Sequence, residues 1–272
     1  MDFSKLQCQS LSVLRQQMKL LKDENALEEF ASRLTSDERR GAAVLQKAAR
    51  QSAEDLRLEK ERLRLLFEYR LALFKKGYQL VAGVDEVGMG PLAGPVVAAA
   101  VILPDEVNLS GLNDSKVLSS KRREELAEKI REQAVSYAFG KASSSEIDRV
   151  NIFQAGLLAM SRAVTGLSVS PDYVLVDARS IPNLPVPQTS LVKGDSKDGS
   201  IAAASILAKV ERDGLMRALD RRFPSFGFAK HKGYPTAQHL GALRKYGPCD
   251  EHRRSFGPVA DRVVSKPRIR VS

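Results

Sequence analysis

Two adjacent carboxylates, Asp85 and Glu86, stand at the end of an apolar run, and a turn containing Gly88 and Gly90 follows them. A strand that ends in this way brings hard oxygen ligands next to exposed backbone N–H groups. This combination suits Mg²⁺ or Mn²⁺ bound beside a phosphate chain. The first candidate for chemistry is therefore a divalent-metal site at the rim of a sheet.

Two further carboxylates are placed where they could join this pair. Asp177 closes the apolar run Tyr173–Asp177, and Asp195 lies just ahead of a predicted helix that begins at Gly199. Each has an ordinary alternative role, because an Asp after a strand often serves a turn, and residues 195–198 can cap a helix. Four carboxylates repel one another at short range, so their convergence would imply a bound cation. Two metal ions roughly 3.5–4 Å apart can activate a water and stabilise the leaving oxygen of a phosphodiester.

The sequence gives little support to other kinds of catalytic site. It contains no G-x-S-x-G, P-loop or H-E-x-x-H motif. The histidines at positions 231, 239 and 252 do not suggest another catalytic arrangement. Cys8 and Cys249 form no C-x-x-C pair, which argues against a zinc finger or a disulfide framework and fits a reducing compartment.

The elements that must position these residues fall into two parts. Residues 1–75 almost lack Pro and Gly and carry apolar residues at helical spacing, which predicts an all-helical N-terminal extension. We expect one long helix there from Ser52 to Phe74, with Ser52 as its N-cap, used for packing or for holding a partner. From residue 76 to 272 strand and helix signals alternate, which predicts an α/β domain.

The strands expected in this domain are Gln79–Asp85, Pro95–Leu103, Ala134–Lys141, Tyr173–Asp177 and Gln188–Val192. Close spacing of the early strands favours an antiparallel start to a mixed sheet. The expected helices are Ser120–Gln133, Ser144–Asn151, Phe153–Gly166, Gly199–Phe223 and Thr236–Tyr246.

Charge is distributed unevenly along the 272 residues, whose net charge is +10. Residues 1–76 carry a net +4, residues 77–204 a net −3 and residues 205–272 a net +9. A basic end favours nucleic acid as the partner, although solvated Lys and Arg side chains are the alternative explanation. The longest apolar stretch, Pro91–Leu103, is too short to span a bilayer, and the N-terminus lacks the layout of a signal peptide. We therefore expect a cytoplasmic, monomeric protein with no membrane partner.

Several motifs, in order from about residue 79 to 260, resemble those of the ribonuclease HII family. The motifs are Gly83–Gly88, Gly90–Ala100, Asp114–Lys116, the strand ending at Asp177, Lys193–Asp195, Ala203–Val210 with Arg212 and Asp213, His231–Tyr234, and His252 and Arg253 with Ser255 and Phe256. The resemblance covers nearly the whole α/β domain, whereas the helical extension is not diagnostic.

This resemblance implies a ribonuclease H-like fold, a mixed sheet flanked by helices. It implies an endoribonuclease that cuts the RNA strand of RNA–DNA hybrids and incises at ribonucleotides embedded in duplex DNA, leaving a 3′-hydroxyl and a 5′-phosphate. By similarity, Asp85, Glu86, Asp177 and Asp195 would be the catalytic cluster that binds Mg²⁺ or Mn²⁺.

The resemblance also marks substrate-binding residues. Backbone groups from Gly88 through Met89 to Gly90 can approach a 2′-hydroxyl closely, because glycine has no side chain in the way. Tyr234 resembles the family tyrosine that contacts the sugar at the RNA–DNA junction, although a buried turn aromatic is the alternative. Lys116 is a plausible phosphate contact. Further candidates for phosphate contacts are Lys209, Lys232, Arg253 and Arg254.

Two positions depart from the family pattern. Met89 stands where Arg is usual between the two glycines, and Val117 stands where Lys is usual. Because Met cannot bond a phosphate as Arg does, we expect weaker binding or a relaxed junction preference, with cleavage retained. Two alternatives stay open: a ribonuclease HIII, which the helical extension and Tyr234 disfavour, and a nucleic-acid-binding module without catalysis, which the four acids disfavour.

Overall fold

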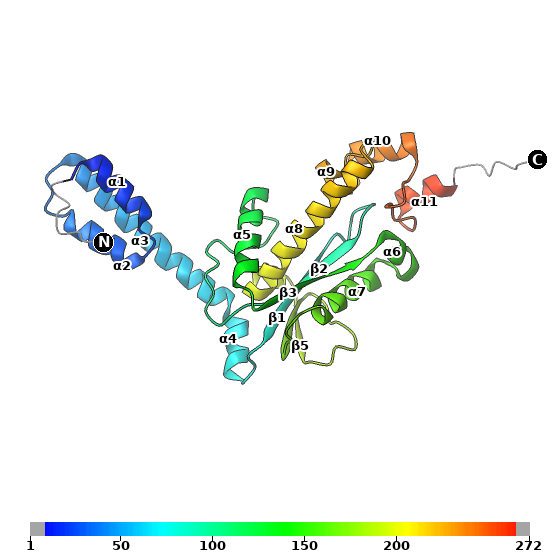
Figure 1. Ribbon diagram of the computed structural model, residues 1–272, viewed down its shortest axis with the longest axis horizontal. Coiled ribbons are helices and arrows are strands. Elements are labelled where there is room, and N and C mark those ends of the chain that lie inside the picture. The colour runs from blue at the N-terminus through cyan, green and yellow to red at the C-terminus, as the bar shows by residue number, and fades with distance from the viewer. Residues whose placement is uncertain (1–8, 265–272) are drawn as a thin grey trace, which may run out of the picture. The chain divides into compact units, whose positions relative to one another are not determined.

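The computed structural model describes residues 9–264 and the side chains of residues 9–261. Spatial contacts divide the chain into two units, one up to Leu65 and one from Leu66 onward (Figure 1). Each unit has its own core, so each is described by itself. Within the described residues, no helix is both long and apolar enough to cross a membrane.

The N-terminal unit is helical, as predicted. Its helices are α1 (Leu11–Leu20), α2 (Glu24–Arg33) and most of α3 (Arg40–Leu66). Ser10 and Asp23 cap α1 and α2 by accepting hydrogen bonds from backbone N–H groups. Its core is formed by Leu14, Leu27, Phe30, Ala31, Leu34, Ala42, Leu45, Ala49 and Ala53.

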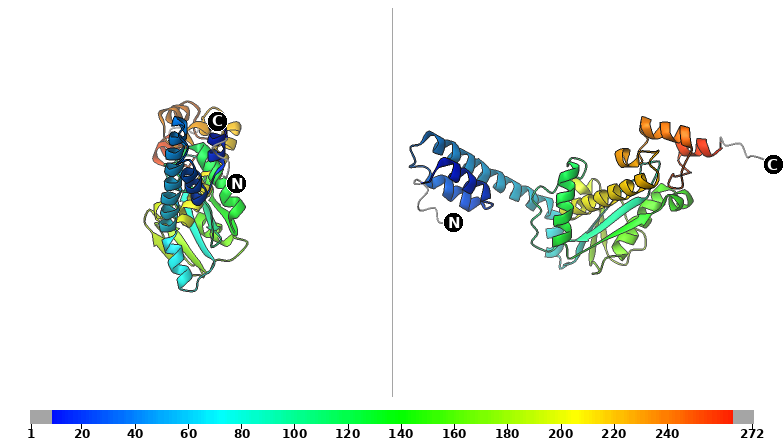
Figure 2. Two further views of the ribbon diagram at one scale, coloured as in Figure 1. Left: turned by 90° about the vertical axis from the view of Figure 1, so that its left-hand side faces the viewer. Right: turned by 45° about the horizontal axis from the view of Figure 1, so that its top comes forward.

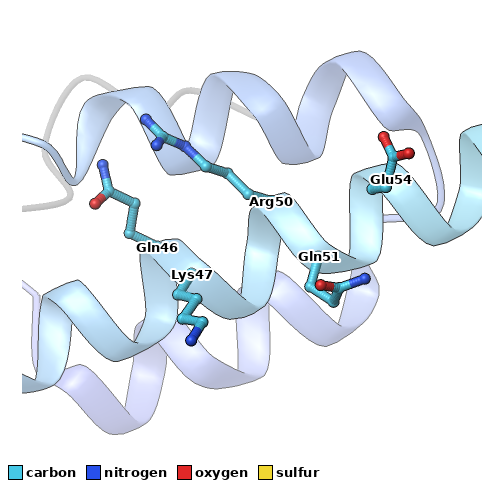
Figure 3. A pocket seen from close by; sticks show the side chains of 5 residues that line it. All are labelled: Gln46, Lys47, Arg50, Gln51 and Glu54. Atoms are coloured by element: carbon cyan, nitrogen blue, oxygen red, sulfur yellow. The ribbon is translucent and has the colours of Figure 1, made fainter.

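A shallow polar hollow of about 280 Å³ lies along α3. Figure 3 shows the side chains that line it, which are Gln46, Lys47, Arg50, Gln51 and Glu54. These side chains project from the side of α3 that the apolar core leaves free.

The prediction of one helix from Ser52 to Phe74 is wrong. α3 begins twelve residues earlier, at Arg40, and a second helix, α4 (Glu68–Lys75), follows after a break. Phe67 leaves helical geometry at φ −97° and ψ 10°, and its buried ring packs where the absent side chain of Gly199 leaves room. The break at Phe67 therefore lies at the start of the second unit, and α4 belongs to that unit.

The second unit is built on a five-stranded mixed sheet. The strands are β1 (Val81–Val87), β2 (Val96–Ile102), β3 (Ser136–Ala142), β4 (Tyr173–Asp177) and β5 (Gln188–Leu191). Their order is β3-β2-β1-β4-β5, with β1, β2 and β3 antiparallel and with β4 parallel to both β1 and β5. The predicted antiparallel start to a mixed sheet is confirmed, and each strand lies within two residues of its predicted range.

Helices cover both faces of this sheet (Figures 1 and 2). The helices that follow α4 in this unit are α5 (Ser120–Gln133), α6 (Ser144–Val150), α7 (Ile152–Thr165), the short η2 (Gly194–Ser196), α8 (Gly199–Arg222), α9 (Phe228–His231), α10 (Ala237–Tyr246) and α11 (Gly257–Val264). Of these, α7 and α8 pack directly on the sheet. Ala82 and Val84 of β1 pack in one core with α7, whereas Val81 packs with Ile201 of α8. Because successive strand residues point to opposite faces, α7 and α8 lie on opposite sides of β1.

Candidate active site

β1 brings the first two acids to the rim of the sheet. Asp85 is only 6% exposed, and its side chain is hydrogen-bonded to Ser205 of α8. Its Oδ1 also accepts a 2.7 Å hydrogen bond from the backbone N–H of Glu86. α8 can approach so closely because Gly83 has no side chain, and a Cβ there would lie 2.1 Å from the carbonyl carbon of Ser200. The strand and the helix thus fix Asp85 from two directions.

β4 and the turn before α8 supply the other two acids. β4 runs parallel to β1 with Val84 opposite Val176, so Asp177 ends its strand at the same edge where Asp85 lies. Asp177 Oδ1 accepts a 2.6 Å hydrogen bond from the backbone N–H of Gly194, which precedes the buried Asp195. The expected helix cap is also present, because the side chain of Asp198 accepts hydrogen bonds from backbone N–H groups in the first turn of α8.

Burial and mutual charge perturb these carboxyls. Burial, followed by the charge of Glu86, raises the pKa of Asp85 well above its ordinary value of 3.8. Burial raises the pKa of Glu86 to about 7, although the nearby Arg179 opposes the shift. Burial also raises the pKa of Asp177, against the hydrogen bond from Gly194. Raised carboxyl pKa values show that the enclosure disfavours negative charge.

Two cationic side chains partly balance this charge. Lys116 Nζ lies 2.8 Å from Asp195 Oδ2, although the lysine side chain is 77% exposed. Arg179 Nη1 lies 3.8 Å from Glu86 Oε1. The other oxygen of Glu86, Oε2, is buried and has no hydrogen-bond partner.

The residues at this rim fit a hard divalent cation. Every donor is a carboxylate oxygen, the ligand type that Mg²⁺ prefers. The unpartnered Oε2 of Glu86 is a buried acceptor that a cation would satisfy. As arranged here, no three His, Cys, Asp or Glu side chains among the described residues already meet at a point that could hold a metal ion. The carboxylates would have to come closer together before three of them could bind one metal ion.

The glycine turn after β1 is held by two buried arginines. Arg253 donates hydrogen bonds to the carbonyls of Gly88, Met89 and Gly94 at 2.6–3.1 Å. Arg212 donates hydrogen bonds to the carbonyl of Pro95, which follows the glycine turn, and to that of Lys232, which precedes Tyr234, each at 3.0 Å. The φ of Gly88 is +94°, and a Cβ there would lie 2.2 Å from Arg212, so only glycine suits this position.

Tyr234 lies beside this turn. Its ring is 42% exposed, and its Cε1 lies 3.6 Å from where a Cβ on Gly90 would be. The two turns are joined by a 2.8 Å hydrogen bond from Leu92 N–H to the Gly233 carbonyl. The structure thus brings Gly88, Gly90 and Tyr234 together, as the sequence predicted.

The three histidines pack against one another next to the turn that carries Tyr234. His239 Nδ1 lies 3.0 Å from the Tyr234 carbonyl oxygen, and its Nε2 lies 3.1 Å from His252 Nε2. The rings of His231 and His239 stack at 4.5 Å between centroids. Burial lowers the pKa of His252 to about 4 and also lowers that of His239. His239 and His252 therefore stay neutral near pH 7, and the three rings pack together beneath the turn.

The proposed phosphate contacts divide in the structure. Arg253 is wrong as a phosphate contact, because its side chain is buried and its donors are bound to carbonyls. Lys209 pairs with Asp213 at 2.8 Å, and Lys232 bonds the Ala229 carbonyl. Lys116 and Arg254 retain exposed side chains.

Sequence reasoning missed Arg179 and the supporting role of Arg212. Arg179 stands two residues after Asp177, where a basic residue looks like an ordinary solvated charge. Its position after a predicted catalytic strand was the only signal that could have identified it. Arg212 was present in a matching motif, without a role.

A mixed sheet with acids from neighbouring strands at one rim and helices on both faces defines a metal-dependent nuclease of the ribonuclease H-like class. A sequence model of the ribonuclease HII family matches residues 82–259. The chain is 53% identical over 229 residues to the ribonuclease HII of Myxococcus xanthus (strain DK1622), which covers 84% of this chain and 78% of that protein. The chain belongs to the ribonuclease HII family.

Solved structures agree with this fold. The crystal structure of ribonuclease H2 from Pyrococcus horikoshii OT3 superposes with a TM-score of 0.56 at 27% identity, covering 66% of this chain and 95% of that one. The structure of Bst-RNase HIII in complex with Mn²⁺ has a TM-score of 0.52 at 20% identity, covering 71% and 72%. The latter supports the fold alone. The ribonuclease HIII alternative is set aside because the family model and the curated relatives that match this chain are ribonuclease HII.

Family membership gives the activity. The protein is a metal-dependent endoribonuclease that cleaves RNA in RNA–DNA hybrids and at ribonucleotides embedded in DNA.

Proposed function

We propose that Asp85, Glu86, Asp177 and Asp195 are the catalytic residues and that together they bind the divalent cations, Mg²⁺ or Mn²⁺. The observation that carries this proposal is the buried, unpartnered Glu86 Oε2 at a rim where the charge of Asp177 on β4 raises the pKa of both Asp85 and Glu86 on β1. When bound, two such cations supply an activated water and stabilise the leaving oxygen of the phosphodiester. Cleavage then leaves a 3′-hydroxyl and a 5′-phosphate.

The neighbouring turns would position the substrate. Arg253 holds the carbonyls of Gly88 and Met89. Backbone groups from Gly88 through Met89 to Gly90 can then lie against the 2′-hydroxyl of the ribonucleotide. The exposed ring of Tyr234 lies beside Gly90, where it can pack on the sugar at the RNA–DNA junction. We assign to Lys116 a phosphate contact, because its side chain is 77% exposed beside Asp195 at this rim.

The substrates are RNA–DNA hybrids and duplex DNA that contains ribonucleotides, bound by a monomer. The relatives that match this chain are bacterial proteins. We place this enzyme's action in the cytoplasm, where bacterial DNA lies.

Product mapping on a duplex with one ribonucleotide tests the proposal. We expect a single incision at the ribonucleotide with Mg²⁺ or Mn²⁺ and none with EDTA. Asp85→Asn should lower the rate of cleavage by at least about 10³-fold, while duplex binding stays measurable. Asp105→Asn, which removes an exposed acid of the same unit, should cleave normally. Full cleavage by Asp85→Asn would refute the site, and a wild type that binds but never cleaves would favour the non-catalytic module.

A further inference from the structure

Arg179 has a position that structural packing alone does not explain. It follows Asp177 at the end of β4, after Ala178, whose φ is +53°. The guanidinium lies over the ring of Phe153 at 4.8 Å, and the side chain is 29% exposed. It thus reaches the acidic rim from the α7 side while part of it remains open to solvent.

One nitrogen of this guanidinium is left without a partner. Arg179 Nη1 is buried and makes no hydrogen bond, and at 3.8 Å the contact with Glu86 Oε1 is an ion pair only. Buried guanidinium donors are ordinarily satisfied. Arg212 and Arg253, the two buried arginines nearby, bind several backbone carbonyls each. Nη1 itself is closed off from solvent, so an anionic acceptor at this rim would meet the exposed part of the Arg179 side chain.

Arg179 also lies next to Met89. A Cβ built on Gly156 of α7 would lie 3.2 Å from Met89 Sδ and 3.3 Å from Arg179 Nη1. Those two atoms are therefore at most about 6.5 Å apart. The glycine leaves the space in which both side chains fit.

We propose that Arg179 binds a backbone phosphate of the nucleic-acid substrate beside the ribonucleotide, taking the place of the arginine expected at position 89. A guanidinium suits this role because it donates two parallel hydrogen bonds to one phosphate. Stacking on Phe153 fixes the orientation of the guanidinium, so less side-chain entropy is lost when it binds a phosphate. The inference rests on the proposed active site, since that site puts the scissile strand at this rim.

The alternative is that Arg179 only balances the charge of Glu86. The two roles differ in the salt dependence of binding. Each phosphate contact releases counterions and adds about 0.9 to the slope of log affinity against log salt for duplex DNA. An internal ion pair with Glu86 adds nothing to that slope.

The test compares Arg179→Gln with the wild-type full chain. Fluorescence anisotropy in EDTA, over a range of KCl concentrations, gives the dissociation constant for a duplex with one ribonucleotide. We expect the dissociation constant to rise about tenfold or more, as for the loss of a charge-assisted hydrogen bond, and the salt slope to fall by about 0.9. Unchanged affinity and slope would overturn the proposal, as would weaker binding with an unchanged slope.

Arg222→Gln is the matched control. Arg222 also lies over a phenylalanine ring, that of Phe223 at 5.1 Å, and also faces a glutamate, Glu251, at 3.4 Å. It stands at the C-terminal end of α8, and its removal should leave the dissociation constant within about twofold of the wild type. Equal losses in both variants would reduce the effect to general charge and overturn the assignment. Thermal melting of each variant verifies that it is folded.

Restoring the expected arginine tests the replacement itself. Met89→Arg in the Arg179→Gln background should recover most of the lost affinity and salt slope. In the wild-type background the same change should add much less, because the two guanidinium groups compete for one phosphate. Equal gains in both backgrounds would mean separate contacts and would refute the replacement. These binding assays contain EDTA, so they do not depend on metal-driven cleavage. Full cleavage by Asp85→Asn would refute the metal site, whereas the binding results above test only Arg179.

Discussion

The acids at the rim are held in a state that disfavours their own charge. Asp85 is buried and the side chain of Glu86 is only 11% exposed, and burial is the largest cause of the raised pKa of each. Arg179 and Lys116 reduce the repulsion without removing it. A cation bound at this rim should therefore stabilise the folded protein.

This arrangement predicts how pH affects the metal-free protein. The pKa of Glu86 is raised from 4.5 to about 7 in the folded state, so its stabilising contribution is complete below pH 4.5 and is lost as the pH rises through 7. The loss is on the order of 3 kcal/mol, because each pKa unit corresponds to 1.36 kcal/mol. In EDTA, the melting temperature of the wild type should fall more between pH 5 and pH 8 than the melting temperature of Glu86→Gln.

Manganese should reverse the trend. A cation binds only the ionised carboxylates, so the rise in melting temperature on adding Mn²⁺ should be larger at pH 8 than at pH 5.5. The histidine cluster has the opposite pH dependence, since burial lowers the pKa of His252 to about 4, and the comparison with Glu86→Gln removes that contribution. Identical pH profiles in EDTA for both proteins would contradict the prediction.

At the scale of elements, two glycines let helices lie against the sheet without a gap. Gly83 of β1 faces the first turn of α8, and a Cβ on Gly140 of β3 would lie 1.9 Å from the carbonyl oxygen of Ala159 in α7. Because backbone rather than a flexible side chain blocks both positions, added atoms must displace a helix. The close approach at Gly83 also fixes Asp85 relative to Ser205.

Gly83→Ala should therefore damage both stability and catalysis. The new methyl group would lie 2.1 Å from the Ser200 backbone, and we expect a loss of at least about 2 kcal/mol in the free energy of unfolding. Gly241→Ala is the control, because a Cβ there meets nothing within 4 Å inside α10. That change should stabilise by up to about 1 kcal/mol. Urea unfolding and single-turnover cleavage measure both effects, and a neutral Gly83→Ala would show that α8 is free to shift.

Local pattern predicted most of the elements, because strand alternation and helix periodicity are properties of neighbouring residues. It missed the break at Phe67, since the residues on either side continue a helical pattern and the cause is packing on Gly199, far away in sequence. For the same reason it could not show that three histidines meet beneath Tyr234.

The candidate site shows the same division. The four acids were predictable from strand ends and from motifs, whereas the role of each basic residue depended on burial. Arg253 looked like a phosphate contact and is bound to carbonyls, whereas Arg179 looked unremarkable and has a free donor at the rim. An arginine's function depends on which acceptors surround it, and sequence spacing does not specify them.

At the scale of the whole molecule, the helical extension and the catalytic unit differ in how widely they are shared. The 229-residue match to the Myxococcus protein is longer than residues 66–272, so it includes part of the extension. The archaeal structure is covered over 95% of its length by 66% of this chain. Nearly all of the archaeal structure thus matches about two thirds of this chain, whereas the bacterial relative also matches part of the extension.

The basic C-terminal segment is less available to nucleic acid than its net charge suggests. Arg212 and Arg253 are buried and bound to carbonyls, and Lys209 is paired with Asp213. Part of the +9 charge therefore supports the substrate turn from inside. Affinity for duplex should depend more on rim residues than on this segment as a whole.

Truncation at two positions tests where the catalytic unit begins. Arg70 is buried and bonds the Leu103 and Pro104 carbonyls, and Leu73 shares an apolar cluster with Val81 and Ile201. We propose that α4 belongs to the catalytic unit. A protein of residues 66–272 should then melt cooperatively and cleave a single embedded ribonucleotide.

A protein of residues 76–272 loses Arg70 and Leu73 together. Deleting one buried large side chain costs about 2–5 kcal/mol, so we expect at least about 4 kcal/mol less stability than in residues 66–272, measured by urea unfolding. Equal stability of the two fragments would place the boundary after α4, where the composition changes. Unfolding of both would mean that the catalytic unit needs the N-terminal helices to fold, although the archaeal relative lacks a counterpart to part of this chain. The difference in stability between the two fragments thus decides whether Phe67 or residue 76 opens the catalytic domain.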